Sequence, residues 1–129
     1  MVIADTSVWI NLFRAPDSEH AAELKRLLRL QEVCLTGVVL AEILRGARSA
    51  VEFARLSSDL EALHYLEISR EAWIKAAELG LSLRGQGRTV PLTDLSIAAI
   101  ALVVDYEIYT LDRDFDPVPG LRFHHPEIN

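Results

Sequence analysis

Short apolar segments alternate along the chain with longer segments in which apolar residues recur at helical spacing. Residues 2–4, 33–35, 65–68 and 107–111 are of the first kind and are predicted as strands. A strand joined to the next through a helix pairs with it in parallel, because the helix returns the chain to the same end of the sheet. The alternation therefore predicts an α/β sandwich of three layers, with a central, mostly parallel sheet flanked by helices.

Capping residues indicate where the helices between these strands begin. Asp5, at the end of the first strand, and Ser18 are typical helix caps. Trp9 and Trp73 lie at helical spacing and are expected in the core. The later helices are predicted over residues 38–47, 51–63, 69–83 and 93–104, and a final edge strand over residues 121–123.

The length of 129 residues fits one domain, and we expect a single domain over residues 1–129. Cys34 is the only cysteine, so neither an intrachain disulfide nor a zinc site built from cysteines can form. The longest strongly apolar run, residues 97–104, is far shorter than the ~20 residues that span a bilayer. Because the first residues also lack a signal-peptide pattern, we expect a cytoplasmic protein without a membrane segment.

The net charge of the chain is −6, from 19 acidic and 13 basic residues. A protein that coats nucleic acid irrespective of sequence needs a basic surface, so the charge disfavours this class. An acidic protein can still act on nucleic acid where bound divalent cations offset its carboxylates. The composition therefore leaves nucleic acid open as a substrate.

Four acidic residues lie at predicted strand ends or a helix start, and a fifth lies within a helix. Asp5 follows the first predicted strand, and Asp112 and Asp114 follow a late one. Asp94 lies in the first turn of a predicted helix. The carboxyl ends of the strands are the usual ligand-binding edge of an open parallel sheet. Glu42 lies in an otherwise apolar helical segment, where an unpaired buried carboxylate is costly.

Each of these acids, taken alone, also has a purely structural interpretation. Asp5 can cap a helix, and the helix dipole can stabilise Asp94. Glu42 can pair with Arg45 one turn later, and the remaining two acids are typical turn residues. Taken together, carboxylates that converge on one edge would repel each other strongly unless a cation lay between them.

Oxygen ligands of this kind suit Mg²⁺ or Mn²⁺, whereas softer ions prefer histidine and cysteine. A carboxylate cluster that holds such ions is a known arrangement for phosphodiester cleavage, because the metal activates water and offsets the charge on the phosphate. The acids therefore predict a metal-binding site that is suited to this chemistry.

Four segments along the chain each carry one part of this acidic set. They are residues 2–10 (VIADTSVWI), 38–47 (VVLAEILRGA), 91–102 (PLTDLSIAAIAL) and 109–115 (YTLDRDF). In this order they resemble the opening strand and aspartate turn, the glutamate helix, and the third and last acidic segments of PIN domains. More narrowly, the chain resembles a PIN-domain ribonuclease of the VapC type, the toxin of a bacterial toxin–antitoxin pair.

The resemblance implies a quartet that holds the metal ion and carries catalysis, formed by Asp5, Glu42, Asp94 and Asp112. It also implies that Asp114 is a further acid near the metal. If Asp114 contacts the metal directly, it is an additional ligand beside the quartet.

Two hydroxyl residues match positions that the family places beside the metal site. They are Ser7 and Thr110, for which local capping is the alternative interpretation. The resemblance thus implies a PIN-like fold with supporting hydroxyl groups around the acids.

By the same resemblance, the protein is a Mg²⁺- or Mn²⁺-dependent endoribonuclease toxin that cleaves structured RNA (tRNA, rRNA or mRNA), leaving a 5′-phosphate and a 3′-hydroxyl. A VapB-like antitoxin is the implied inhibitor, and an arginine of the antitoxin would suit the acidic pocket. A homodimer, assembled further with the antitoxin, is also implied. The alternative is a catalytically silent PIN-like scaffold that binds RNA or protein, because a sequence cannot show turnover.

Two pairs of arginines lie near the acids in the sequence. Arg45 and Arg48 follow Glu42, and Arg84 and Arg88 precede the third acidic segment. Guanidinium groups can hold RNA phosphates, whereas solvated surface charge is the simpler interpretation of any single one.

Other functional classes fit the residues less well. A response-regulator receiver needs a lysine after a late strand, but the only lysines, Lys25 and Lys75, lie in predicted helices. The sequence has no Gly-x-Ser-x-Gly motif of a serine hydrolase. We interpret His124 and His125 as tail residues rather than metal ligands, because adjacent side chains project in different directions.

Overall fold

The computed structural model describes residues 1–127, and within this range four strands form one sheet of order β3-β2-β1-β4. The strands are β1 (Val2–Ala4), β2 (Val33–Thr36), β3 (His64–Leu66) and β4 (Glu107–Tyr109). The helices are α1 (Thr6–Arg14), α2 (Glu19–Arg29), α3 (Gly37–Arg45), α4 (Ala50–Leu60), α5 (Arg70–Gly85), α6 (Leu92–Val104) and the 3₁₀ helix η1 (Arg113–Phe115).

Neighbouring strands of the sheet all pair in parallel. Val2 of β1 lies opposite both Val33 of β2 and Glu107 of β4, and Cys34 lies opposite His64 of β3. Because the strands run in the same direction, their carboxyl ends meet at one edge of the sheet. The predicted α/β fold with a parallel central sheet is confirmed.

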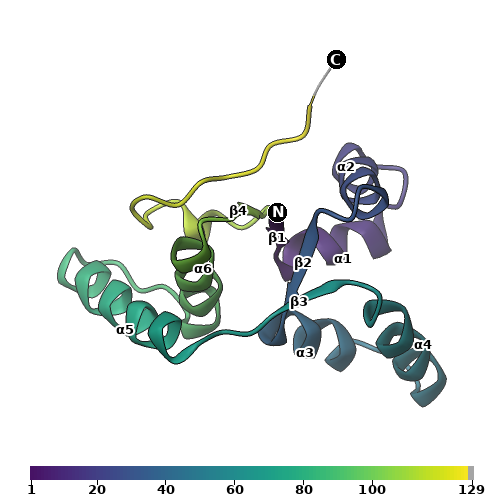
Figure 1. The fold of residues 1–129 in the computed structure, drawn as a ribbon, viewed down its shortest axis with the longest axis horizontal. Coiled ribbons are helices and arrows are strands. Elements are labelled where there is room, and N and C mark those ends of the chain that lie inside the picture. Colours follow the sequence, from purple (N-terminus) through teal and green to yellow (C-terminus); the bar gives the residue numbers. More distant parts are fainter. Residues whose placement is uncertain (128–129) are drawn as a thin grey trace.

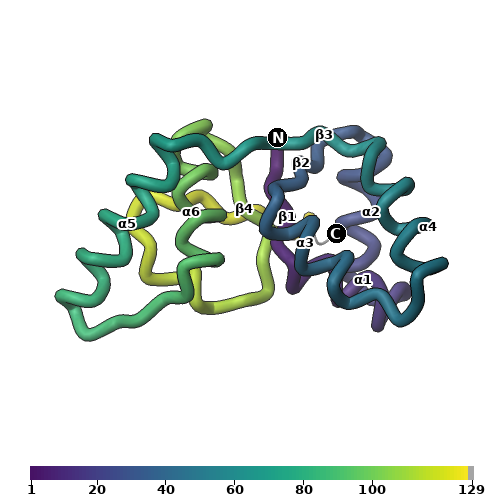
Figure 2. The backbone as a smooth tube through the Cα atoms, turned by 90° about the horizontal axis from the view of Figure 1, so that it is seen from below, coloured from purple at the N-terminus to yellow at the C-terminus, as the bar shows by residue number. Residues whose placement is uncertain are grey.

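Helices cover both faces of the sheet and complete the three layers. Figure 1 shows α5 and α6 on one side of the sheet and α1 to α4 on the other, and Figure 2 shows the same layers from below. Helix α6 contacts both α5 and β4, and all its residues from Leu95 to Ala101 are buried. This explains why α6 is apolar on every side rather than along one stripe.

Side chains at the ends of strands and loops begin several of these helices. A side-chain oxygen accepts a hydrogen bond from a first-turn N–H group in α1, α2, α4 and α5, and the capping residues are Asp5, Ser18, Ser49 and Ser69. Each cap satisfies a donor that has no partner inside the helix, which fixes where the helix begins. The cap at α1 also orients the first acidic residue at the edge of the sheet.

Two details of the fold differ from the sequence predictions. Residues 121–123 form no strand, and a single parallel bridge joins Phe123 to Ile108. Backbone hydrogen bonds join Ile108 of β4 to Arg122 and His124 at 2.9 and 2.8 Å, so the pairing at this edge is limited to a single residue of β4. Trp73 is 43% exposed because it lies on the outer face of α5, whereas Trp9 is buried as predicted.

The interpretation of His124 as a tail residue is wrong. Its side chain is only 14% exposed, and its two ring nitrogens lie 2.6 Å from Glu23 Oε2 and 3.1 Å from Glu107 Oε1. Its ring also packs against Tyr109, with 5.2 Å between the ring centres. His124 therefore ties the C-terminal segment to α2 and β4.

In the part of the chain that the structure describes, no helix is both long enough and apolar enough to cross a membrane.

Candidate metal centre

Asp5 lies at the carboxyl end of β1, where it caps α1, and its carboxylate is held from both sides. Oδ1 accepts hydrogen bonds from the Ser7 hydroxyl and from the Ser7 backbone N–H at 3.1 Å, and Oδ2 accepts from the Thr110 hydroxyl at 2.8 Å. Burial raises the pKa of Asp5, and the hydrogen bonds oppose this effect. Asp5 is therefore an enclosed carboxylate with a fixed orientation.

The same two hydroxyl groups also hold the loop that follows β4. Ser7 Oγ accepts a hydrogen bond from the Leu111 N–H at 2.9 Å, and Thr110 Oγ1 accepts one from the Asp112 N–H at 2.9 Å. Each hydroxyl thus donates to Asp5 and accepts from the loop. Through these bonds the position of Asp112 depends on that of Asp5.

Glu42 reaches the same edge of the sheet from α3. Its Oε1 accepts a hydrogen bond from the hydroxyl of Thr6, the first residue of α1, at 3.0 Å. No ion pair joins Glu42 to Arg45 in residues 1–127, so this structural interpretation of Glu42 is wrong. Thr6 was not among the predicted site residues. Its position next to Asp5, at the start of a helix, could have indicated that its hydroxyl group lies beside the acids.

Three further carboxylates gather where α6 begins and η1 follows β4. Asp94, Asp112 and Asp114 each offer an oxygen, and these oxygens lie within 4.8 Å of one another. Asp94 occupies the first turn of α6. Asp112 caps η1 by accepting a hydrogen bond from the Asp114 N–H at 2.9 Å, which brings both side chains to the cluster.

Asp94 lies near enough to the other four acids for their charges to act on it. Burial raises the pKa of Asp94 to about 6, and the carboxylates of the other four acids add to the rise, in the order Asp112, Asp114, Asp5 and Glu42. Within residues 1–127 no arginine or lysine forms an ion pair with any of them. The structure thus brings Asp94, Asp112 and Asp114 into one cluster, with Asp5 and Glu42 near enough to add to its negative charge, and no described arginine or lysine pairs with these acids.

This donor set fits a divalent cation that prefers oxygen. The oxygens of Asp94, Asp112 and Asp114 lie within 4.8 Å of one another, so a single ion with ligand distances of about 2.1 Å, as Mg²⁺ has, could contact all three. Among the described residues, no histidine or cysteine joins this cluster, so softer ions are disfavoured. The cluster can hold a hard divalent metal ion, which would offset the repulsion that acts on Asp94.

Comparison with known sequences gives an independent result. A family model described as the PIN domain matches residues 2–121. Ribonuclease VapC11 of Mycobacterium tuberculosis is 31% identical over 122 residues, which cover 92% of this chain and 91% of that protein. Ribonuclease VapC5 of the same species is 31% identical over 127 residues, which cover 92% of this chain and 87% of that protein.

Comparison with solved structures supports the fold. The crystal structure of VapBC2 from Rickettsia felis, bound to a DNA fragment from its promoter, matches with a TM-score of 0.80. The match covers 96% of this chain and 98% of that chain at 20% sequence identity. At this identity the likeness concerns the fold alone.

Proposed function

The chain belongs to the PIN domain family, with VapC ribonucleases among its relatives, and on this premise we propose that it is a metal-dependent endoribonuclease toxin restrained by an antitoxin. The observation that carries the proposal is that Asp94, Asp112 and Asp114 form a carboxylate cluster, to which Asp5 and Glu42 add negative charge, and that no described arginine or lysine pairs with any of them. Carboxylates gathered in this way repel each other and destabilise the folded protein unless a cation offsets their charge. A divalent metal ion would do so, and metal-assisted hydrolysis of a phosphodiester is the chemistry of a ribonuclease.

The acids divide into a quartet and one additional residue in this proposal. Asp5, Glu42, Asp94 and Asp112 would hold a Mg²⁺ or Mn²⁺ ion and carry catalysis, and Asp114, whose oxygen lies close to those of Asp94 and Asp112, would be a further ligand. When bound, the ion lowers the pKa of a coordinated water and offsets charge on the phosphate, so that cleavage leaves a 5′-phosphate and a 3′-hydroxyl.

The hydroxyl groups position the acids before RNA binds. Ser7 and Thr110 keep both oxygens of Asp5 oriented, and Thr6 does the same for Glu42. Preorganised carboxylates need little rearrangement when the ion and the substrate bind, which favours the transition state. We assign these three residues a positioning role.

The same family membership suggests the partners. Structures of VapBC and a toxin–antitoxin complex from Klebsiella pneumoniae are among the structural neighbours. We propose that a VapB-like antitoxin covers the acidic centre of this chain and places a basic side chain among the carboxylates. The proposal further includes a cytoplasmic homodimer in which residues 1–129 of each chain form one domain.

Cleavage of cellular RNA by the purified, antitoxin-free protein tests the proposal. In Mg²⁺ or Mn²⁺ we expect discrete fragments with a 5′-phosphate at each new end, no fragments in EDTA, and suppression when the antitoxin is added. If a folded protein cleaves none of the total RNA of its own host in either metal, the chain is a binding scaffold and the proposal is wrong.

A further inference from the structure

Two hollows on the surface are lined by arginines and have no carboxylate among their described lining residues. One lies between α3 and α4, where Arg45 and Arg48 line it together with Phe53. The other lies between the end of α5 and the start of α6 and is lined by Arg84 and Arg88. For a chain with a net charge of −6, two cationic hollows free of acids are unexpected.

Each hollow is lined in part by a helix that carries one of the acids, and the two helices belong to opposite layers of the sandwich. Arg45 follows Glu42 by about one turn of α3. Leu95, which lines the second hollow, is the neighbour of Asp94 in α6. Because α3 and α4 lie on one side of the sheet and α5 and α6 on the other (Figures 1 and 2), the two hollows belong to opposite layers, and the sheet between these layers carries Asp5 at the end of β1.

The four arginines of these hollows are available to an external anion. All four side chains are exposed. Within residues 1–127, the arginines that pair with carboxylates are Arg26, Arg113 and Arg122, and none of them lines these hollows. A guanidinium group that is not paired with a carboxylate can donate two parallel hydrogen bonds to one phosphate.

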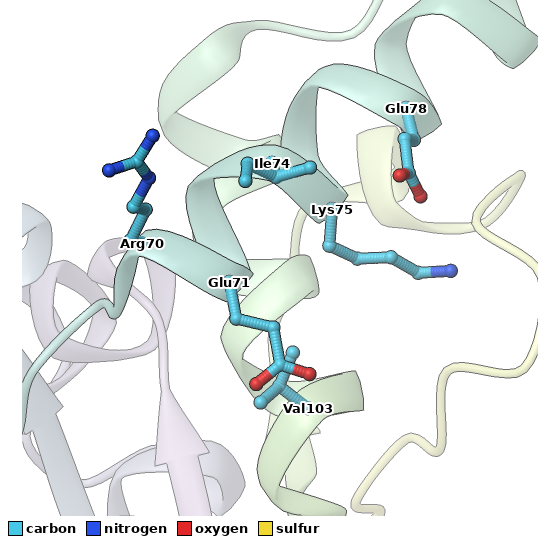
Figure 3. A pocket seen from close by; sticks show the side chains of 6 residues that line it. All are labelled: Arg70, Glu71, Ile74, Lys75, Glu78 and Val103. Carbon is cyan, nitrogen blue, oxygen red and sulfur yellow. The ribbon is translucent and has the colours of Figure 1, made fainter.

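A third hollow provides a contrast. It lies between the start of α5 and the end of α6, and Figure 3 shows that Arg70 and Lys75 share it with Glu71 and Glu78. Val103, at the far end of α6 from Asp94, lines it as well. Since its charges are mixed and it lies away from the acidic centre, it favours no anion.

We infer that single-stranded RNA crosses the acidic centre from one arginine hollow to the other. Arg45 and Arg48 hold backbone phosphates on one side of the cleaved bond, and Arg84 and Arg88 hold them on the other. The carboxylates repel a phosphate backbone, so flanking cations are needed to bring the substrate to them. Phe53, which is 47% exposed in the first hollow, offers a face on which a base can stack.

This inference rests on the proposed function, and steady-state cleavage of an RNA that the wild-type protein cuts tests it. The variants are Arg45→Ala/Arg48→Ala and Arg84→Ala/Arg88→Ala. Arg70→Ala/Lys75→Ala is the matched control, because it also removes two cations. Measurements include kcat, KM, their salt dependence, and the thermal midpoint of each variant as a check of folding.

Each arginine pair is expected to contribute to substrate binding rather than to the chemical step. Loss of a pair should raise KM by about tenfold and leave kcat within about twofold. The slope of log(kcat/KM) against log salt should decrease by about 1.4, because two contacts to single-stranded RNA are lost. The control variant should match the wild type, and Arg45→Lys/Arg48→Lys should recover most of the affinity, since lysine also binds phosphate.

The possible failures are distinguishable. If the wild type cleaves RNA but both alanine pairs keep its KM and salt slope, the inference is wrong and the proposed function stands. If these variants cleave normally but lose inhibition by the antitoxin, the hollows bind a protein rather than RNA, which also overturns the inference. If the wild type cleaves no RNA, the proposed function fails, and the inference fails with it.

Discussion

The side chains of Thr110 and Asp5, which are 105 residues apart in the sequence, are joined by a hydrogen bond of 2.8 Å. The same Thr110 hydroxyl accepts a hydrogen bond from the N–H of Asp112 at 2.9 Å. One hydroxyl group therefore sets the relative positions of two acids that come from opposite ends of the chain. The acidic centre is assembled by such contacts as well as by the parallel sheet beneath it.

Replacing Thr110 with valine should weaken both catalysis and stability. The variant leaves Oδ2 of Asp5 and the N–H of Asp112 without their partner, which costs about 2 kcal/mol of unfolding free energy. The loop that carries Asp112 is then less well positioned, and kcat should fall by about tenfold. Urea unfolding and steady-state RNA cleavage measure the two effects. Thr110→Ser keeps the hydroxyl and should resemble the wild type; an active, stable Thr110→Val protein would contradict the positioning role.

The raised pKa of Asp94 predicts how the metal-free protein responds to pH. Because the folded-state pKa of about 6 lies above the ordinary value of 3.8, the folded protein binds more protons than the unfolded chain between these values. The contribution of Asp94 to stability is therefore present at low pH and is lost as pH rises through about 6. Screening by solvent reduces this contribution to about 1 kcal/mol.

Thermal unfolding in EDTA, compared between the wild type and Asp94→Asn, measures this contribution. The variant should be the more stable protein at pH 7.5, and the difference should shrink toward pH 4.5, where Asp94 is protonated. Saturating Mg²⁺ at pH 7.5 should stabilise the wild type and leave the variant nearly unchanged. If the difference in thermal midpoint between the two proteins does not vary with pH, burial and the neighbouring carboxylates do not raise the pKa of Asp94.

The contacts of His124 predict a structural role that is separate from catalysis. His124→Ala removes one of the two partners of the buried Glu23, which keeps Arg26, and one contact of Glu107, and should lower the unfolding free energy by about 2 kcal/mol. The rate of RNA cleavage well below the unfolding temperature should not change. His125→Ala is the matched control, because its side chain is exposed and adjacent. Equal stability of the two variants would rule out the role proposed for His124.

The fold could be predicted from the sequence because its signals are local. The alternation of apolar and helical segments gives the parallel sheet, and Asp5 and Ser18 cap the helices that were expected after them. The rule that ligands bind at the carboxyl ends of parallel strands also anticipates the convergence of the acids. Their roles in metal binding and catalysis stay predictions until the variants are measured.

The remaining features depend on contacts between distant residues, which a local pattern does not reveal. Thr6 and Glu42 meet only once α1 and α3 pack against each other. His124 is in a segment with few regular features, and its partner Glu23 is 101 residues away. Trp73 follows the helical spacing of α5, but the spacing alone does not say which side of the helix faces the core.

The metal dependence of RNA cleavage by the wild type, Asp94→Asn and Asp59→Asn tests the central claim most directly. Asp59 is an exposed acid on α4 and serves as the matched control. We predict that cleavage by the wild type and Asp59→Asn rises with Mn²⁺ or Mg²⁺ to the same plateau, and that Asp94→Asn loses at least about 100-fold in rate with weaker metal binding by calorimetry. Cleavage that is unchanged in EDTA, or that survives in a folded Asp94→Asn protein, would contradict the claim that these carboxylates form a catalytic metal centre.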